Sequence, residues 1–354
     1  MRGRPALGEL PEVRPYQPGG TVGDEPAGKL SANESYLGPG PEVIAAIEAV
    51  APEVHVYRTS RHLRAAISSQ LGVDEERVIV TNGSDEVCFL VGVAMIRSGD
   101  EVVMSDPPYR INEIVSVLNG AELVRVPVVD GGHDLDALAA AAQDARLVWL
   151  PTPHNPTGVA LSPAQLEGFL ELVPGECWVV LDEAYRAFLP LDQRPDARSL
   201  LDRYPNLLIQ RTFSKGAGLA GARVGFAVGD ADAIARLDSY RAPFNVNAIA
   251  LAAAQASIEH PAWEEYAISE TCRQRGEFEA FLGGLEIEFW PSQTNFVSFR
   301  PRSADRAIEA LGSRGISARS GSDLGCPGWV RVTIGSAPRM RLVRESLIEM
   351  EEMT

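Results

Sequence analysis

Cysteine, histidine and lysine are scarce in this chain of 354 residues. The four cysteines lie far apart, no Cys-x-x-Cys pair occurs, and there are only five histidines. This pattern excludes the usual spacings of zinc sites and redox-active dithiols. A chain of this length can bury a sizeable core without disulfides. We therefore expect reduced thiols and no metal site.

Long apolar runs and positive charge are also lacking. The longest apolar run covers residues 88–96, and the first twenty residues contain charges and prolines where a secretory signal needs an apolar core. A membrane span needs about 20 apolar residues, so we expect no membrane segment, no export and a cytoplasmic location. The formal net charge of -16 repels phosphate backbones and anionic lipids, which argues against nucleic-acid and membrane partners. An anionic substrate would need local arginines.

Lysine is represented by Lys29 and Lys215 alone, so thirty of the 32 basic residues are arginines. A coding bias towards arginine and alanine accounts for the ratio as a whole, but it does not account for the two lysines that remain. A lysine amine can lose its proton and condense with a carbonyl, whereas a guanidinium cannot readily do so. At least one lysine is therefore a candidate for chemistry.

The distribution of apolar residues divides the chain into three parts. Residues 1–40 are rich in proline and glycine and predict an extended arm. In residues 41–247, short apolar runs alternate with segments of helical period, which is typical of a mainly parallel sheet covered on both faces. Residues 248–354 contain two long helical segments followed by short strand-like runs, which predicts a smaller α+β domain. The expected fold class is α/β.

Two polar segments follow apolar runs at places where open α/β sheets bind ligands. In TNGSDE (residues 81–86) a strand meets the start of a helix at Gly83, and backbone N–H groups at such an end bind phosphate. A simple helix cap is the alternative. In PTPHNPTG (residues 151–158), Asn155 could direct an amide towards a ligand oxygen, or the segment could be only a turn.

A third polar position is Asp182, which ends the apolar run WVVLD. This run is expected to be buried on both faces, and an unpaired buried carboxylate is very costly. Asp182 therefore needs a cationic partner. That partner is either an arginine of the protein or a cation on a ligand.

The fourth segment, residues 211–225, contains glycines in the spacing of the dinucleotide fingerprint. That fingerprint requires a helix to begin at the glycines, but the following residues ARVGFAVGD predict a strand, so we exclude a dinucleotide site. The remaining chemistry is that of Thr212, Ser214, Lys215 and Arg223. Hydroxyls and an arginine suit a phosphate, and the lysine suits a carbonyl.

A phosphate, an aldehyde and a pyridine nitrogen occur together in pyridoxal phosphate. The segments NGSDE, DPPY, HNPTG, LDEAY and TFSKGAGLAGARVG follow one another over about 300 residues, and in this order they resemble the fold-type I aminotransferases of class I/II. KLSANESYLGPGP, APFNVN and GWVRVTIGS are most similar to histidinol-phosphate aminotransferases and the related aromatic amino-acid aminotransferases. The resemblance implies a large domain with a mainly parallel seven-stranded sheet and a smaller α+β domain.

Matched position by position, the resemblance implies pyridoxal phosphate as cofactor and a role for each residue around its ring. Lys215 would form the internal aldimine and shuttle the proton, and Asp182 would pair with the pyridinium nitrogen. Tyr185 and Asn155 would hydrogen-bond the phenolic oxygen of the ring. Tyr109 would stack on the ring face.

The residues that the resemblance implies at the cofactor phosphate come from two segments: Gly83, Ser84, Asp85, Thr212, Ser214 and Arg223. Tyr57 would reach the phosphate in the neighbouring subunit, which implies a homodimer with shared active sites. Lys29 matches no catalytic position and is expected at the surface near the arm.

Substrate contacts are implied at several further positions. Arg331 matches the arginine that binds the α-carboxylate, because a planar guanidinium can grip a carboxylate at two points. Asn33 is also implied in substrate binding. Arg319, Tyr16 and Arg58 are candidates to neutralise a substrate phosphate, and a solvated surface position is the alternative for each.

The chain departs from the family pattern in two places near the expected substrate mouth. Tyr36 stands where the family usually has proline, and residues 57–60 replace a Tyr-Pro-Asp-Pro-like turn. The resemblance implies an aminotransferase of amino-acid biosynthesis with a ping-pong mechanism, a small-molecule amino donor and a keto acid such as 2-oxoglutarate. Histidinol phosphate is the preferred donor. The alternatives are an aromatic amino-acid aminotransferase, a decarboxylase of the same fold, and an inactive regulatory protein that holds the cofactor.

Overall fold

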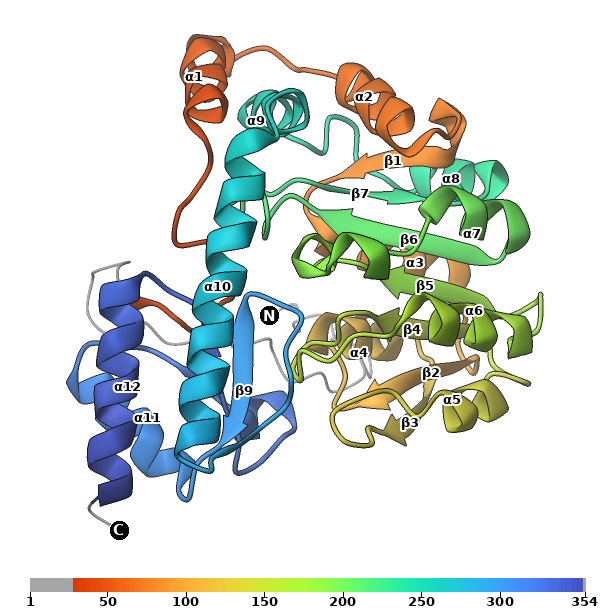
Figure 1. Ribbon diagram of the computed structural model, residues 1–354. Helices are drawn as coiled ribbons and strands as arrows, with labels where there is room; N and C mark the ends of the chain where they lie inside the picture. The colour runs from red at the N-terminus through yellow and green to blue at the C-terminus, as the bar shows by residue number, and fades with distance from the viewer. Residues whose placement is uncertain (1–27, 353–354) are drawn as a thin grey trace, which may run out of the picture.

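The computed structural model describes residues 28–352. It contains a large sheet with helices on both faces and, beside it, a smaller sheet that carries the C-terminal helices (Figure 1). Tyr16 and residues 1–27 of the predicted arm lie outside the described residues. The described end of the arm joins the small domain, because Leu30 lies in its core and Lys29 forms a β-bridge with Ser317.

The large sheet has seven strands in the order β1-β7-β6-β5-β4-β2-β3. The strands are β1 (Val78–Thr81), β2 (Glu101–Asp106), β3 (Glu122–Pro127), β4 (Leu147–Pro151), β5 (Trp178–Asp182), β6 (Leu207–Thr212) and β7 (Gly225–Val228). Strand β7 is antiparallel to both of its neighbours, and the other neighbouring pairs are parallel. This confirms the mainly parallel seven-stranded sheet. The central strands are apolar because helices cover both faces.

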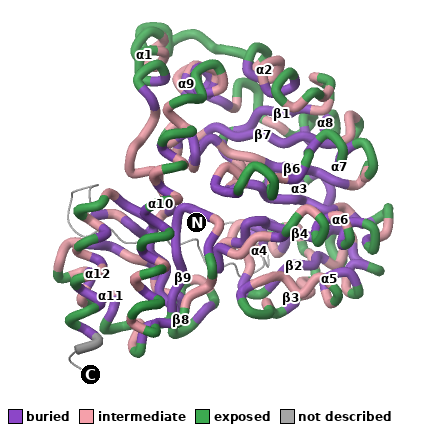
Figure 2. The backbone as a smooth tube through the Cα atoms, viewed as in Figure 1, coloured by how far each residue is buried: buried purple, intermediate pink, exposed green. Residues whose placement is uncertain are grey.

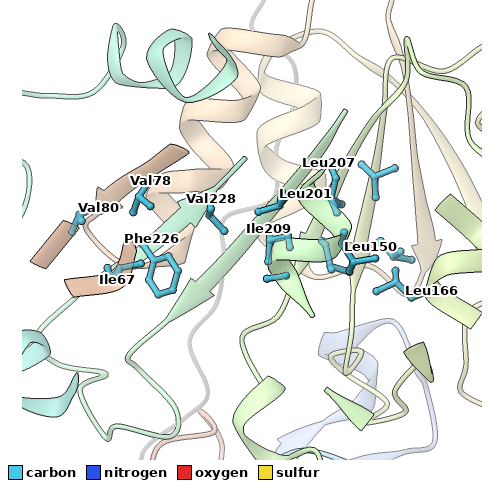
Figure 3. Packing of buried hydrophobic residues seen from close by; sticks show 14 of the residues in the cluster. Ile67, Val78, Val80, Leu150, Leu166, Leu201, Leu207, Ile209, Phe226 and Val228 are labelled. Carbon is cyan, nitrogen blue, oxygen red and sulfur yellow. The ribbon is translucent and has the colours of Figure 1, made fainter. Parts of the chain in front are cut away.

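Helices pack on both faces of this sheet. One face is covered by α3 (Ser84–Met95), α4 (Arg110–Leu118) and α8 (Ala231–Asp238). The helices of the other layer are α1 (Pro41–Val50), α2 (Arg61–Leu71), α5 (Leu135–Ala141), α6 (Pro163–Leu172), α7 (Ala197–Arg203) and α9 (Ala248–Glu259). In this second layer Ile67, Leu166 and Leu201 meet side chains of the sheet (Figure 3). Burial of each such aliphatic side chain contributes about 1.5–3 kcal/mol.

Local signals explain several helix ends. Gly72 has a φ of 66°, a left-handed conformation that favours glycine and ends α2. Ser162 and Gln165 form a capping box at the start of α6, as expected for a helix after Ser162. Ser60 precedes α2, but its side chain makes no capping hydrogen bond. The sequence pattern does not predict α7 or α8, which have only seven and eight residues.

The small domain has a four-stranded antiparallel sheet in the order β10-β11-β9-β8. Its elements are α10 (Ala262–Gly284), β8 (Glu288–Phe289), β9 (Phe296–Arg300), α11 (Ala304–Ser313), β10 (Arg319–Ser320), β11 (Val330–Thr333) and α12 (Ala337–Glu352). Phe278, Phe299 and Leu347 are among the side chains of its separate core. The sequence pattern predicts a last helix from Met340, but the helix begins three residues earlier, at Ala337.

Helix α9 belongs to the core of the large sheet. Its Ala250, Ala253 and Ala254 share a cluster with Val43 of α1. The boundary between the core of the large sheet and the core of the small domain therefore lies between α9 and α10. The sequence pattern places this boundary after residue 247. The reason is that α9 is apolar on nearly all sides, so its periodicity does not reveal which sheet it covers.

Most strands of the two sheets are buried, the edge strands β3 and β8 are largely exposed, and the outer sides of the helices are exposed (Figure 2). The described residues also form short 3₁₀ helices: Ala51–Glu53, Glu75–Arg77, Arg186–Phe188, Leu191–Gln193 and Gly321–Leu324. The four cysteines are free thiols, three of them buried. No helix in residues 28–352 combines the length and the apolar character that a membrane crossing requires.

Candidate active site

A cleft of about 680 Å³ lies where the carboxyl ends of the large-sheet strands meet the small domain. Asp106, Pro151, Asp182 and Thr212, the last residues of β2, β4, β5 and β6, line it. The predicted site residues that line the same cleft are Asn33, Ser84, Asp85, Tyr109, Asn155, Asp182, Tyr185, Thr212, Ser214, Lys215, Arg223, Arg319 and Arg331. The structure thus brings together residues that are up to about 300 positions apart in the sequence.

Lys215 follows β6 and extends into this cleft. Its Nζ donates hydrogen bonds to the backbone oxygens of Asn33 at 3.1 Å and Ala32 at 3.4 Å, and lies 5.6 Å from the centre of the Tyr185 ring. Lys29, by contrast, forms an ion pair with Glu34 at 2.8 Å and does not line the cleft. Lys215 is therefore the lysine that is positioned for chemistry.

Asp182 is the buried acid of the site, with 7% of its surface exposed. Its Oδ1 accepts a hydrogen bond from the backbone N–H of Ala184 at 3.0 Å. Burial raises the pKa of Asp182 to about 6, and hydrogen bonds from Gln210 and Ala184 oppose that rise. No ion pair joins Asp182 to an arginine or lysine within residues 28–352. Of the two partners open from the sequence, the structure favours a ligand cation.

The N-terminus of α3 provides a place for a phosphate. Gly83, just before the helix, has a φ of 76°, and a Cβ there would lie 2.5 Å from Arg223 Nη2. The absence of a side chain lets the guanidinium approach the free N–H groups of the first helical turn. On the other side, Thr212 Oγ1 lies 2.9 Å from Ser214 Oγ. Helix end, hydroxyls and guanidinium suit a phosphate monoester.

Two tyrosines stand on either side of the space between Lys215 and the helix end. Tyr109 precedes α4 and donates from its Oη to Asp85 Oδ1 at 2.9 Å. Burial raises the pKa of Tyr109 well above its usual range. Tyr185 Oη accepts a hydrogen bond from Asn33 Nδ2 at 2.8 Å, and burial raises the pKa of Tyr185 to about 12. Both phenols therefore remain neutral donors at neutral pH.

The contacts of Asn33 differ from those expected of a residue that binds the substrate. Its Nδ2 is used on Tyr185, and its Oδ1 accepts from Thr333 Oγ1 at 3.1 Å. Asn295 donates to its backbone oxygen at 2.9 Å. The side chain thus holds Tyr185 in place, rather than standing free for a substrate. Thr333 lies within the motif GWVRVTIGS but was given no role there, and Asn295 was not indicated by any sequence motif.

Arg319 and Arg331 carry two positive charges into the small-domain side of the cleft, and both are buried. They are a register pair of the antiparallel strands β10 and β11, so their side chains lie on the same face. Arg331 donates to Asn155 Oδ1 at 2.6 Å and to the backbone oxygen of Ser31 at 3.0 Å. Like charges this close favour an anion between them.

Three sequence candidates lie elsewhere in the described part. Tyr57 does not line the cleft of its own chain: 80% of it is exposed, and its ring stacks on Phe244 with centres 4.6 Å apart. Arg58 forms an exposed ion pair with Glu53. Tyr36 is near Glu270 of α10, away from the cleft, and burial raises its pKa to about 12.

A buried polar group that no sequence motif indicated lies beside Asp182. Gln210 is fully buried in β6 as the register partner of Asp182, and Cys88 of α3 lies beside it. The available signal was a glutamine within the apolar run NLLIQRTF, next to a strand that ends in a carboxylate.

A lysine, a buried carboxylate and a phosphate-binding helix end in one cleft of this α/β fold define a pyridoxal-phosphate enzyme of the aminotransferase type. The chain belongs to the aminotransferase class I and II family, whose model matches residues 27–347. The resemblance, the enzyme class and the cofactor expected from the sequence are confirmed.

Similarity to individual proteins shows which group within this family the chain resembles. Histidinol-phosphate aminotransferase 1 of Dechloromonas aromatica is 35% identical over 355 residues, which is 97% of each chain. Its namesake in Thiobacillus denitrificans is 39% identical over 342 residues, covering 92% of this chain and 88% of the relative. The crystal structure of the Sinorhizobium meliloti histidinol-phosphate aminotransferase in complex with pyridoxal-5'-phosphate matches with a TM-score of 0.87 and 29% identity, over 92% of this chain and 91% of that one. This chain is an aminotransferase of the histidinol-phosphate aminotransferase group.

Proposed function

We propose that the chain is a homodimeric aminotransferase that moves the amino group of histidinol phosphate to 2-oxoglutarate by a ping-pong mechanism. The observation that carries the proposal is the buried register pair of Arg319 and Arg331 in a cleft that also contains Lys215. Two guanidiniums side by side offer a binding site for a doubly charged anion in a protein whose net charge is -16.

The chemistry of the two substrates supports the use of both arginines. Histidinol phosphate has a phosphate ester one carbon away from its amine-bearing carbon and has no carboxylate. The keto acid has a carboxylate at the corresponding place. A phosphate carries about two charges and three acceptor oxygens, so it can engage both guanidiniums, whereas one bidentate guanidinium suffices for a carboxylate. An aromatic amino acid would need a neutral, apolar cleft mouth instead.

The residues around the ring fit the cofactor of the family. When bound, pyridoxal phosphate supplies an aldehyde for the substrate amine and a pyridine ring that accepts electrons from the substrate carbon. Asp182 would hold a proton at the ring nitrogen. Tyr185 Oη and Asn155 Nδ2 would donate to the phenolic oxygen, and Tyr109 would lie against the ring. Gly83, Ser84 and Asp85, together with Thr212, Ser214 and Arg223, would hold the phosphate.

Lys215 is the group that transfers the proton. Its amine would hold the cofactor through the aldehyde and, once free, would take the proton from the amine-bearing carbon of the substrate. The Asn33 and Ala32 oxygens, at 3.1 and 3.4 Å, hold that amine in the cleft. Arg331 would bind the substrate acid, and its hydrogen bond to Asn155 would connect it to the residues around the ring.

The proposal of a homodimer rests on the exposed apolar surface around Tyr57. Tyr57, Val54, Val56 and Phe244 are all exposed, although each has a large apolar side chain. A second copy of the chain would cover them and bring the phenol of Tyr57 to the phosphate site of the neighbouring cleft.

A panel of amino donors assayed with 2-oxoglutarate tests the proposal. Histidinol phosphate should give a kcat/KM at least about tenfold above those of phenylalanine, tyrosine and unphosphorylated histidinol, because each charge-assisted phosphate contact contributes about 1.5–3 kcal/mol. Unphosphorylated histidinol is the matched control, since it lacks only the phosphate. Good turnover of phenylalanine or tyrosine without turnover of histidinol phosphate would replace the proposal with the aromatic alternative.

A further inference from the structure

Gln210 is a polar side chain in an otherwise apolar layer. It is fully buried at the end of β6 and is the register partner of Asp182 in the parallel neighbour β5. Partners in register direct their side chains to the same face of a sheet, so the amide and the carboxylate are neighbours. Two residues earlier, the pair Val180 and Leu208 faces α3 within the apolar core. The Gln210 amide therefore has to find its hydrogen bonds towards the carboxyl ends of β5 and β6.

A buried thiol orients the Gln210 amide. Cys88 Sγ lies 3.6 Å from Gln210 Oε1 and 3.3 Å from Asn112 Oδ1. The S–H group is the donor between these two oxygens, and burial raises the pKa of Cys88 well above its usual range, so the donor proton is retained. With Oε1 facing Cys88, the N–H₂ end of the amide faces the other way. The reverse orientation would set Oε1 against the Asp182 carboxylate.

The N–H₂ end acts on Asp182. Within the described residues, Gln210 Nε2 is buried and has no well-formed hydrogen bond, yet its amide is near enough to Asp182 to lower the pKa of that carboxyl against the burial that raises it. Asp182 thus accepts one hydrogen bond on the protein side, from the backbone N–H of Ala184, and has the Gln210 amide as a neighbouring donor, while its other side faces the cleft. The Ala184 N–H belongs to the backbone, so any residue other than proline at that position would supply it. The second donor depends on the side chain of Gln210.

We propose that Gln210 is a positioning residue that keeps the Asp182 carboxylate ionised and directed at the ring nitrogen of the cofactor, with Cys88 and Asn112 fixing its amide. This inference rests on the proposed role of Asp182. Carboxylate and ring nitrogen compete for one proton. A donor to the carboxylate makes Asp182 the weaker base, so the proton stays on the nitrogen. Without Gln210 the carboxylate becomes more basic, so the shared proton moves from the ring nitrogen towards Asp182 at any given pH.

The test is the protonation state of the ring nitrogen in the holoenzyme, read by ¹⁵N NMR with pyridoxal phosphate labelled at that nitrogen. Gln210→Leu removes the amide but keeps the side-chain volume. We expect the wild-type nitrogen to give the signal of a protonated ring from pH 6 to 9, and the variant to give a signal displaced towards that of the unprotonated ring at the same pH values. The dissociation constant of pyridoxal phosphate should also rise about tenfold, since a charge-assisted contact is lost.

Matched variants separate this role from packing. Leu208→Val perturbs the same face of the same strand without touching Asp182, and its nitrogen signal should match that of the wild type. Cys88→Ala leaves the amide present but unanchored, so it should shift the nitrogen in the same direction as Gln210→Leu, by less. It also tests the idea should Gln210→Leu fail to fold.

Two outcomes are decisive in different ways. If Asp182→Asn changes the nitrogen signal but Gln210→Leu and Cys88→Ala do not, Gln210 is only a core residue and the inference is overturned. If Asp182→Asn itself leaves the nitrogen signal unchanged, the role proposed for Asp182 fails, and this inference fails with it.

Discussion

Arg319 and Arg331 are register partners on β10 and β11, yet they have different neighbours. Arg331 is tied to Asn155 at 2.6 Å and so to the cofactor side of the cleft. Arg319 lies towards the rim, 3.9 Å from Asp323 of the following 3₁₀ helix. The two guanidiniums therefore present different parts of one anion site. Under the proposed function, Arg331 would serve every substrate, whereas Arg319 would serve the larger, doubly charged one.

Replacing Arg319 should separate the substrates. Arg319→Ala should raise KM for histidinol phosphate and lower kcat/KM roughly ten- to a hundred-fold, because one charge-assisted contact of about 1.5–3 kcal/mol is lost. Any activity towards phenylalanine or tyrosine should stay within about twofold of the wild type. Arg314→Ala, which removes an arginine paired with Glu349 outside the cleft, is the control in the steady-state assays. Equal losses on both kinds of donor would contradict a phosphate role.

Lys215 and Lys29 allow a direct comparison of the only two lysines. Lys215→Ala should abolish turnover, since no other lysine can bind the aldehyde or carry the proton, while the circular dichroism spectrum stays unchanged. Lys29→Ala should retain near-normal kcat. Borohydride reduction of the wild-type holoenzyme should attach the cofactor to Lys215, as peptide mass spectrometry would reveal. Attachment at Lys29 would show that the assignment is wrong.

The raised pKa of Asp182 predicts a pH-dependent cost in the cofactor-free protein. With a folded pKa of about 6 against an ordinary value of 3.8, the folded chain binds the proton more tightly than the unfolded chain. The contribution to stability is thus present below pH 3.8, is lost as pH rises through 6, and is fully lost at pH 8. Asp182→Asn should therefore stabilise the cofactor-free protein at pH 8 by about 1–3 kcal/mol.

Urea unfolding at pH 5 and pH 8 measures this cost, and the gain from Asp182→Asn should be smaller at pH 5. In the holoenzyme the same substitution should lower kcat by orders of magnitude, because the ring nitrogen loses its acid partner. Near-normal kcat in Asp182→Asn would mean that the carboxylate is only structural.

Shared sites predict complementation between two inactive or weakened variants. Tyr57→Ala should raise the dissociation constant of pyridoxal phosphate about tenfold, through loss of one phosphate contact per site. Mixed with Lys215→Ala under conditions that exchange subunits, it should form heterodimers with one complete site that combines Lys215 of one chain and Tyr57 of the other. Activity should rise towards half of the wild-type value per dimer. If each variant keeps its own activity after mixing, with dimers present by sedimentation, Tyr57 serves its own subunit or none.

Much of this protein was determined by the sequence alone. The period of apolar residues marks strands β1 to β7 and most helices, because a strand buried on both faces and a helix with one apolar side leave different local patterns. Lys215 and Asp182 are conspicuous for a similar reason: each is a reactive group at the end of an apolar run. The family motifs then connect both residues to one cofactor.

Only the tertiary structure decided which of these groups meet. Gln210 is the neighbour of Asp182 because β5 and β6 pair in one register, and Arg331 reaches Asn155 because the small domain lies over the large sheet. Helix α9 joins the large core, and Tyr57 faces away from its own cleft, for equally non-local reasons. Local periodicity sets what each segment becomes, but register and docking depend on contacts between segments far apart, which no single stretch of sequence contains.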